Sequence, residues 1–389
     1  MNVLLSVLGF LVILFPIVII HEFGHFLFAR MNGIAVLKFS VGFGGDKWAI
    51  FSWVDKYGTK WQITPLLLGG FVTMKGQYDN PEDQFKYNEQ YKSLSNAEKK
   101  DSFLFKNRAQ KIAVAFAGPL FNIILTITIL FFLFLFYGKP ITQNIVGGFS
   151  ENSVAKSAGL QIGDRIIQID NKKINDFSDI VNILKLSTGK KMSVAVERSV
   201  KSAKKPVVLE KILFFKFAPM KVGNSYKLGI HSNIASTAFK KMTFFKSVTY
   251  AFKHTFQLSN QFLINIRQMI SGQRSSSEIG GIISIAGISG KALNYGFYSV
   301  MYLMAYLSIV IGIMNLMPIP VLDGGQIFIY TFETIIRRDI PNKIKAFIFS
   351  SGWLFVLALM LLATYNDIKR VIISKVNVSK IVNSQHYKK

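Results

Sequence analysis

Four long apolar runs limit what this chain can fold into more than any other feature of the sequence. The first covers about residues 3–29, the second about 109–137, the third begins near 297, and the fourth covers about 346–365. Each is close to the roughly 20 apolar residues that a helix needs to cross a bilayer. Because lipid cannot hydrogen-bond an unpaired backbone, such runs predict helices. We therefore expect a polytopic α-helical membrane protein with about four transmembrane helices and with both termini on one side.

The composition agrees with a membrane protein that carries a soluble part. The chain has 389 residues, enough for two or three domains, and half of them are hydrophobic. The formal charge of +25 comes from Lys residues that are spread over every polar segment and not gathered in one patch. We therefore expect a lipid bilayer, and no nucleic acid, among the partners. The absence of Cys excludes disulfides, thiolate ligands and a Cys nucleophile.

The first apolar run lacks the features of a cleaved signal peptide. No charged segment precedes it, and it is longer than the apolar part of a signal peptide. We expect it to stay in the chain as the first span.

The polar segments between the spans predict a membrane-associated β region and a soluble domain. Residues 37–76 alternate apolar and polar residues between glycines, which is typical of short strands and turns, and their apolar share favours a hairpin region at or within the membrane. The polar stretch 77–100 predicts a loop or a surface helix. Residues 143–230 mix strand and helix patterns over a length usual for one α+β domain. The aromatic and Lys pattern of 238–272 predicts an amphipathic helix.

The expected organisation therefore has four parts in chain order. They are an N-terminal membrane part, an inserted soluble domain, amphipathic linker helices and a C-terminal membrane part, at residues 1–138, 139–232, 233–296 and 297–389.

The distribution of basic residues gives two opposed indications of orientation. The short loop after the third span is rich in Arg and Lys, which favours a cytoplasmic loop and an outside position for the soluble domain. The basic C-terminal tail favours the opposite orientation. We expect the soluble domain to lie outside.

The first span contains three polar groups that are costly in a membrane. His21, Glu22 and His25 fit the pattern H-E-x-x-H. Residues four apart share one face of a helix, so both imidazoles can reach one zinc ion. Glu22 can then act as the general base that activates water. The alternative is a pair of histidines that are hydrogen-bonded to a neighbouring span, but a Glu beside them is costly there unless it has a function.

A zinc site needs a third protein ligand, and the most suitable residue is far along the chain. The glycine and histidine of the metzincin extension are missing, because Phe28 and Met31 occupy those positions. Asp323 ends an apolar span, where an unpaired carboxylate is costly. Pro318 and Pro320 interrupt helical hydrogen bonding just before it. The alternative is a proline-kinked helix whose Asp only caps the next helix.

Together these motifs resemble one protein family. H-E-F-G-H in a first span, with N-L-M-P-I-P-V-L-D-G-G in a later one, resembles the site-2 proteases, which are intramembrane zinc metalloproteases. The chain is most similar to the bacterial regulator-of-sigma-E protease group. Further parts of that pattern are G-F-G-G, L-L-L-G-G-F-V-T-M-K-G, A-G-P-L-F-N and G-G-I-I-S-I-A-G.

The resemblance implies roles for particular residues. Zinc is expected on His21, His25 and Asp323, with Glu22 as the general base. The substrate is expected near Asn315, Pro318 and Pro320 and along a membrane-associated strand edge. The residues implied for that edge are Gly42–Gly44 around Phe43, and Gly69, Gly70 and Phe71. Asn122 is also expected to face the site, with a role that the resemblance defines less closely.

The soluble domain resembles a PDZ domain on the residues 152–174, which contain the Gly159–Asp164 element. Residues 144–149 are expected to supply a strand and loop for the carboxylate of a C-terminal peptide ligand. The resemblance implies an extracytoplasmic domain that excludes substrates with large ectodomains. Some members carry two PDZ domains, whereas this chain has room for one, so gating is expected to differ.

The resemblance also implies the setting and the substrates. We expect a multi-pass protein of the bacterial cytoplasmic membrane that cuts single-span membrane proteins, such as anti-sigma factors already trimmed by another protease, or remnant signal peptides. Two other classes remain open. A metal transporter would show more polar residues along its spans, and a non-catalytic PDZ scaffold would give Glu22 and Asp323 no purpose.

Overall fold

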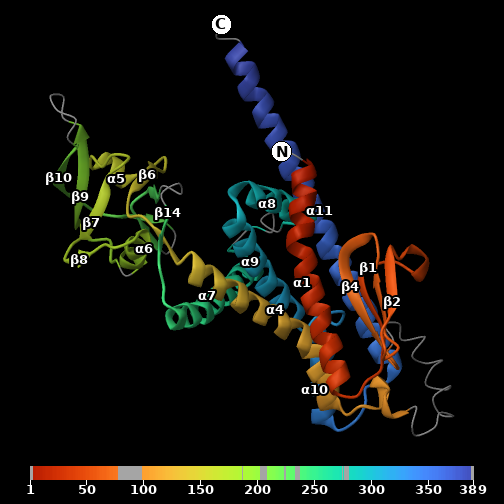
Figure 1. The fold of residues 1–389 in the computed structure, drawn as a ribbon. Coiled ribbons are helices and arrows are strands. Elements are labelled where there is room, and N and C mark those ends of the chain that lie inside the picture. The colour runs from red at the N-terminus through yellow and green to blue at the C-terminus, as the bar shows by residue number, and fades with distance from the viewer. Residues whose placement is uncertain are drawn as a thin grey trace. The chain divides into compact units, whose positions relative to one another are not determined.

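The computed structural model describes residues 3–77, 99–185, 187–201, 208–222, 225–232, 237–273, 275 and 280–386. Residues 78–98, where a loop or surface helix is expected, lie outside the described residues. The chain divides into two compact units. The first comprises Met1–Leu133 with Val248–Lys389, and the second comprises Phe134–Ser247 (Figure 1).

The first unit is mainly helical. Its helices are α1 (Val3–Met31), α4 (Arg108–Phe136), α7 (Phe244–Ile270), α8 (Ile282–Tyr295), α9 (Phe297–Asn315), α10 (Asp323–Ile336) and α11 (Asn342–His386), of which α4 and α7 continue into the second unit. Four helical segments are long and apolar enough to cross a membrane, namely Val3–Met31, Arg108–Phe136, Phe297–Asn315 and Lys343–Ile372. The four expected spans are therefore confirmed as membrane-spanning candidates.

Small residues allow close packing of the helices around α1. A Cβ added to Gly9 of α1 would lie 2.6 Å from the carbonyl of Ser289 on α8, and one added to Gly290 would meet Ser6. A Cβ added to Gly24 would lie 2.5 Å from the carbonyl oxygen of Ala117 on α4. Close backbone approach through small residues is the usual way in which membrane helices associate.

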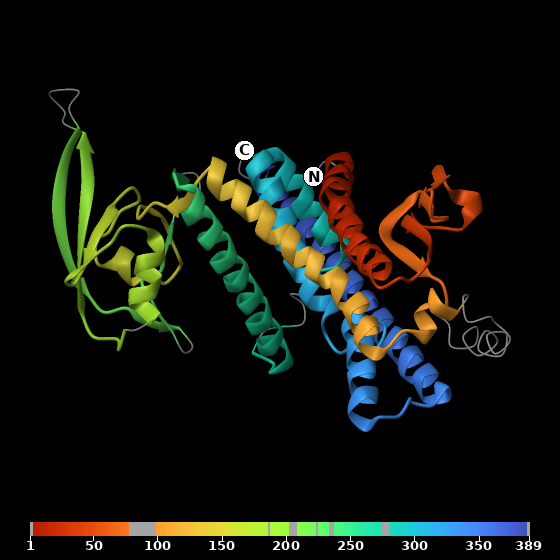
Figure 2. The same cartoon turned by 60° about the horizontal axis from the view of Figure 1, so that its bottom comes forward.

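A four-stranded sheet follows α1 in the chain and packs against it (Figure 2). Its strands, β1 (Val36–Phe43), β2 (Phe51–Val54), β3 (Lys60–Ile63) and β4 (Leu66–Met74), lie in the order β2-β3-β1-β4. β1 is parallel to β3 and antiparallel to β4. The sequence predicts only strands and turns here, whereas the structure shows one mixed sheet with β4 at an edge. On α1, the ring of Phe26 lies 5.8 Å from that of Phe39 and 5.0 Å from that of Trp61.

The second unit is a small α+β domain. Strands β10 (Val208–Phe217), β9 (Met192–Lys201), β7 (Arg165–Ile169) and β8 (Lys172–Lys173) form one sheet in that order. Shorter antiparallel pairs join β6 (Val146–Phe149) to β13 (Ile230–Ser232), β5 (Lys139–Thr142) to β14 (Thr237–Lys240) and β11 (Met220–Val222) to β12 (Ser225–Lys227). Helices α5 (Val154–Ser157) and α6 (Phe177–Lys185) complete it. Its core is aliphatic and includes Val146, Ile166, Ile169, Ile180, Val194 and Val196.

A pocket of about 570 Å³ lies on the second unit between α6 and the β13 segment. Apolar side chains of α6 line one side, and Ile230 and His231 line the other. β6 lies one strand further on, as the partner of β13. Residues 144–149, which are expected to supply a strand and loop for a peptide carboxylate, do not line this pocket, whereas residues 226–231 do.

A buried ion pair holds the turn of the Gly159–Asp164 element. The carboxylate of Asp164 is 1% exposed and accepts hydrogen bonds from Arg198 Nε at 2.7 Å and Nη2 at 2.8 Å. These hydrogen bonds raise the pKa of the Arg198 guanidinium. The same guanidinium donates to the carbonyl of Gly159 at 3.0 Å.

Arg198→Ala should destabilise this unit strongly, because it leaves the Asp164 charge buried and unpaired. We expect the free energy of unfolding to fall by about 3–5 kcal/mol. Hydrogen–deuterium exchange of β7 and β9 in the full chain measures this change. Arg165→Ala is the matched control, because the half-exposed Arg165 pairs with Glu197 only at 3.6 Å, and such exposed pairs contribute about 0–1 kcal/mol. Equal effects of the two changes would contradict the argument.

Candidate metal centre

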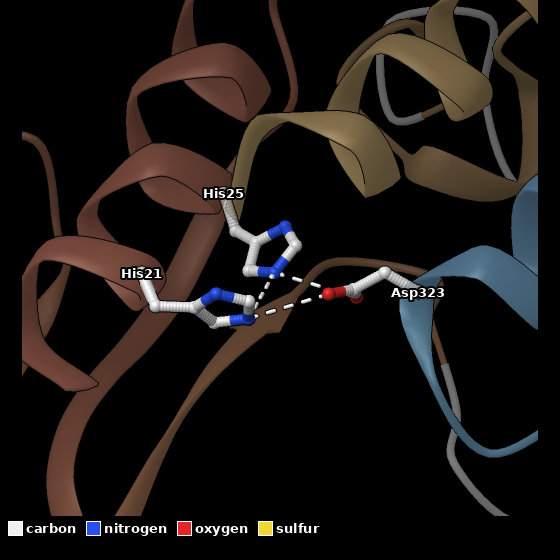
Figure 3. A group of neighbouring side chains, drawn as sticks. All are labelled: His21, His25 and Asp323. Carbon is white, nitrogen blue, oxygen red and sulfur yellow. Dashed lines mark hydrogen bonds and ion pairs between the residues drawn. The ribbon is translucent and has the colours of Figure 1, made fainter. Parts of the chain in front are cut away.

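Helix α1 brings two imidazoles to one face. His21 and His25 are four residues apart, and their Nε2 atoms lie 3.3 Å from each other (Figure 3). Their ring planes are nearly perpendicular, at 81°. The two Nε2 lone pairs can therefore converge on one point without stacking of the rings.

The third group comes from the start of α10. Helix α9 ends at Asn315, and the turn that contains Pro318 and Pro320 leads to Asp323, the first residue of α10. A Cβ added to Gly324 would lie 2.3 Å from the carbonyl of Leu316, and one added to Gly325 would lie 2.2 Å from the carbonyl oxygen of Ile319. Only glycine permits this close return of the chain, so the two glycines fix the place of Asp323.

The three groups have the spacing of zinc ligands. Asp323 Oδ2 lies 3.3 Å from His21 Nε2, and Asp323 Oδ1 lies 3.4 Å from His25 Nε2. A tetrahedron with metal–ligand bonds of roughly 2.0–2.1 Å has edges of about 3.3–3.4 Å, which the separation of the two Nε2 atoms matches. One ligand atom from each of the three residues lies within 4.8 Å of the others. The side chains are 11%, 12% and 16% exposed for His21, His25 and Asp323. Three neutral or anionic donors gathered so closely in an apolar setting fit one divalent cation, and two imidazoles with one carboxylate fit zinc.

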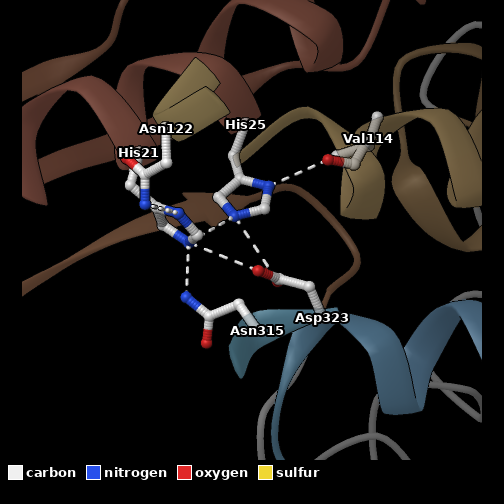
Figure 4. A network of polar contacts seen from close by, with 6 residues as sticks. All are labelled: His21, His25, Val114, Asn122, Asn315 and Asp323. Atoms are coloured by element: carbon white, nitrogen blue, oxygen red, sulfur yellow. Dashed lines mark hydrogen bonds and ion pairs between the residues drawn. The ribbon is translucent and has the colours of Figure 1, made fainter. Parts of the chain in front are cut away.

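The outer nitrogens of both imidazoles also have partners (Figure 4). His25 Nδ1 donates to the carbonyl of Val114 at 2.8 Å. The amide nitrogen of Asn315 is close to the inner nitrogen, 3.5 Å from His21 Nε2, whereas that of Asn122 lies 3.2 Å from the outer nitrogen, His21 Nδ1. Such partners orient a metal-ligating imidazole and fix which nitrogen carries the hydrogen.

Gly118 of α4 makes room for both imidazoles, and sequence reasoning did not single it out as a site residue. A Cβ at this position would lie 2.3 Å from His25 Nε2 and 2.7 Å from His21 Cε1. Val114, Gly118, Asn122 and Thr126 follow one another at intervals of four residues, so they share one face of α4. The sequence shows this four-residue interval within an apolar helix, so it could have indicated a shared face. It does not show that this face packs against α1.

Gly118→Ala should abolish high-affinity metal binding without unfolding the protein. Ala normally stabilises a helix interior by roughly 1 kcal/mol over Gly, so a loss here has to come from the clash with the imidazoles. The metal content of the purified protein and its thermal unfolding are the two measurements. Gly148→Ala is the matched control, because an added Cβ there has no described atom within 4 Å. Normal metal content in Gly118→Ala would contradict the geometry.

The remaining predicted residues fall into two groups. Glu22 lies beside β4, because a Cβ added to Gly70 would lie 3.0 Å from Glu22 Cγ. Gly69 lies against the ring of Phe43, so these residues and Phe71 belong to the neighbouring β4 and β1 strands. Gly42, with a φ of +94°, and Gly44 flank Phe43 at the end of β1 and lie near Thr64.

Two acidic residues that follow the histidines in the sequence lie elsewhere. Asp46 is bonded to Lys38 at 2.5 Å and to Lys60 at 3.0 Å, and these hydrogen bonds lower the pKa of its carboxyl. Asp55 accepts from the indole of Trp61 and from the backbone of Thr59. Neither belongs to the group of His21, His25 and Asp323 that could hold a metal ion in the described part of the chain.

Comparison with known proteins agrees with this site. Residues 9–359 match the profile of peptidase family M50. The chain is 32% identical over 368 residues to a protein of Brucella suis biovar 1, covering 93% of this chain and 95% of that protein. It is 34% identical over 371 residues to a protein of Campylobacter jejuni, covering 92% and 91%. It is 31% identical over 385 residues to a protein of Agrobacterium fabrum, covering 96% and 100%. All three relatives are named as candidate zinc metalloproteases. This chain therefore belongs to peptidase family M50, the site-2 protease family that its motifs resemble.

Proposed function

We propose that this protein is a zinc-dependent intramembrane protease that hydrolyses peptide bonds within the transmembrane segments of single-span membrane proteins. One observation supports this most directly. His21, His25 and Asp323 converge at zinc-ligand spacing on helices of a polytopic unit, and Glu22 lies on the same helix as the histidines. A soluble protease would not need its ligands on a helix that can span a membrane.

The residues divide the chemistry among them. When bound, zinc polarises the scissile carbonyl and makes water acidic enough to attack near neutral pH. Glu22 accepts the proton of the attacking water and passes it to the nitrogen of the leaving amine. Asn315, whose amide lies 3.5 Å from His21 Nε2, is placed to donate a hydrogen bond to the carbonyl oxygen as negative charge develops on it. Pro318 and Pro320 hold the turn that positions Asn315 and Asp323 together.

The edge of the sheet offers a way to present an unwound substrate. A helical peptide bond resists attack because its carbonyl is already hydrogen-bonded, whereas a strand added to a sheet edge exposes alternate carbonyls. Among the described strands, β4 pairs only with β1 and has its other edge available. Gly70 of this strand lies against Glu22, so a substrate strand along β4 would pass the general base.

The second unit supports a gating role of PDZ type. Its pocket between α6 and the β13 segment is lined largely by apolar residues, with residues 227–231 at one side, which suits the C-terminal residues of a peptide. We infer that this unit lies on the extracytoplasmic side of a bacterial cytoplasmic membrane and excludes substrates with large ectodomains. Anti-sigma factors already trimmed by another protease, and remnant signal peptides, are the substrate classes that fit.

The test uses the purified full chain in detergent with a short-ectodomain, single-span substrate that carries helix-breaking residues. We expect cleavage inside the span, its loss on addition of a zinc chelator, and its return when zinc is restored. Replacing the helix-breaking residues by Leu should slow cleavage, because the backbone stays hydrogen-bonded.

Two results would count against the proposal. Cleavage that is insensitive to the chelator would show that zinc is not required. Cleavage only outside the span would contradict intramembrane hydrolysis. Cleavage of the Leu-substituted substrate at the same rate as the substrate with helix-breaking residues would contradict the need for an unwound helix. A matched substrate with a large folded ectodomain should be cut more slowly if the second unit acts as a filter.

A further inference from the structure

Asn122 is a buried amide between the metal centre and α9, and one of its atoms has no evident partner. The side chain is 0% exposed. Its Nδ2 lies 3.2 Å from His21 Nδ1, while its Oδ1 has no hydrogen-bond partner among the residues that the structure describes. A buried unsatisfied carbonyl oxygen costs about 1–3 kcal/mol, so this orphan atom requires a physical reason.

The backbone at Asn122 is held by contacts with α9, which keep this position beside His21. The Asn122 carbonyl accepts a hydrogen bond from Ser308 Oγ at 2.9 Å, which ties α4 to α9. Thr126 Oγ1 reaches the same carbonyl at 2.9 Å and that of Ala305 at 3.0 Å. Gly312 of α9 lies against the side chain, because a Cβ there would be 3.2 Å from Asn122 Cβ. Rotation of the terminal amide is the freedom that remains.

The chemistry of the imidazole decides which amide atom should face it. His21 Nε2 is the nitrogen directed at Asp323 and His25, so it has to keep its lone pair for a metal. In a neutral imidazole the hydrogen is then on Nδ1, and this N–H needs an acceptor. His25 has such an acceptor in the carbonyl of Val114. For His21, the amide of Asn122 is the partner at Nδ1 within the described residues.

We propose that Asn122 is a positioning residue for zinc, and that its Oδ1 accepts the hydrogen bond from His21 Nδ1. A half-turn of the amide exchanges Oδ1 and Nδ2, because the two atoms are nearly equal in size. This rotation pairs Oδ1 with the Nδ1 hydrogen and moves Nδ2 to the position that Oδ1 leaves. The need of His21 Nδ1 for an acceptor is therefore what favours it. The inference rests on the proposed function and assigns Asn122 to the ligand His21, where the resemblance implied contact with substrate.

The experiment measures zinc affinity by competition with a chelator, in full-length protein carrying Glu22→Gln so that proteolysis has no part in the result. Asn122→Leu removes the acceptor and should weaken zinc binding roughly 10–100-fold, the usual effect of losing an outer partner. Asn122→Asp keeps an acceptor oxygen and should bind zinc at least as tightly as the parent. Asn32→Leu, at the end of α1 and bonded to Phe28, is the matched control and should change nothing.

A spectroscopic measurement separates positioning from packing. The chain has five histidines, so nitrogen NMR of histidine-labelled protein can resolve His21. With zinc bound, we expect His21 Nδ1 to be protonated. Its nitrogen chemical shift should change in Asn122→Asp, where the acceptor differs, and in Asn122→Leu it should lose the contribution of the hydrogen bond. A mere packing defect would lower thermal stability in both variants without this pattern.

The outcomes are distinct. Parental zinc affinity in a folded Asn122→Leu variant would overturn the inference alone. If that variant does not fold, weakened zinc binding in Asn122→Asp would overturn it, because a carboxylate facing a bare Nδ1 repels it. Failure of the Glu22→Gln parent to take up zinc would overturn the proposed function and this inference together.

Discussion

Glu22→Gln should leave zinc in place and slow cleavage of a transmembrane substrate by roughly 10²–10⁴-fold, the contribution typical of a general base. Gln has nearly the shape of Glu but cannot accept a proton, so the loss reports proton transfer and not packing. Glu22 lies beside Gly70 of β4, where a larger rearrangement would have little space. The measurements are the rate of cleavage inside the span and the zinc content of the same preparation.

The control for this change is Glu151→Gln, because Glu151 is an exposed glutamate of the second unit. It should cleave at the rate of the unaltered protein. Loss of zinc from Glu22→Gln would contradict the assignment of Glu22 as a base that is not a ligand. Full activity in Glu22→Gln would leave the non-catalytic scaffold as the better interpretation.

Asp323→Ala should remove both zinc and activity. The two imidazoles alone leave zinc two protein ligands, whereas catalytic zinc sites keep three. The loss of affinity should exceed the roughly 10–100-fold that follows removal of an outer partner, so it should also exceed that of Asn122→Leu. Chelator competition measures the affinity, and cleavage of the test substrate measures the activity.

Asp339→Ala is the matched control for the ligand change. This aspartate follows the same helix α10, its side chain is 80% exposed, and it pairs with Arg108 at 2.8 Å. It should keep zinc and activity. Normal zinc affinity in Asp323→Ala would show that the site uses another third ligand.

The sequence predicted the membrane-spanning candidates and the candidate ligand residues for identifiable physical reasons. Apolar runs of bilayer length permit little besides helices, and the interval from His21 to His25 is a direct consequence of helical geometry. Asp323 could also be predicted from the sequence, because a carboxylate at the end of an apolar run is costly without a partner. That these residues converge was an implication of the family resemblance, and the distances of 3.3–3.4 Å now support it.

Other features could not be predicted because they depend on contacts between distant segments. The parallel pairing of β1 with β3 requires knowledge of the sheet order, which strand alternation does not contain. Gly118 is one glycine among 29 in the chain, and its importance appears only when α4 lies against α1. The pocket in the second unit is likewise lined by residues 226–231 together with α6, two segments that are far apart in the sequence.

The distribution of the site along the chain has a consequence for how the cell makes this enzyme. His21 and Asn315 are 294 residues apart, and Asp323 follows both. A ribosome that has inserted the first helices has therefore produced the proposed base and two proposed ligands but no complete centre. Hydrolytic capability arises late, after the turn before α10 has folded back onto the first span. Nascent chains and fragments that end before Asp323 therefore lack one of the three candidate ligands.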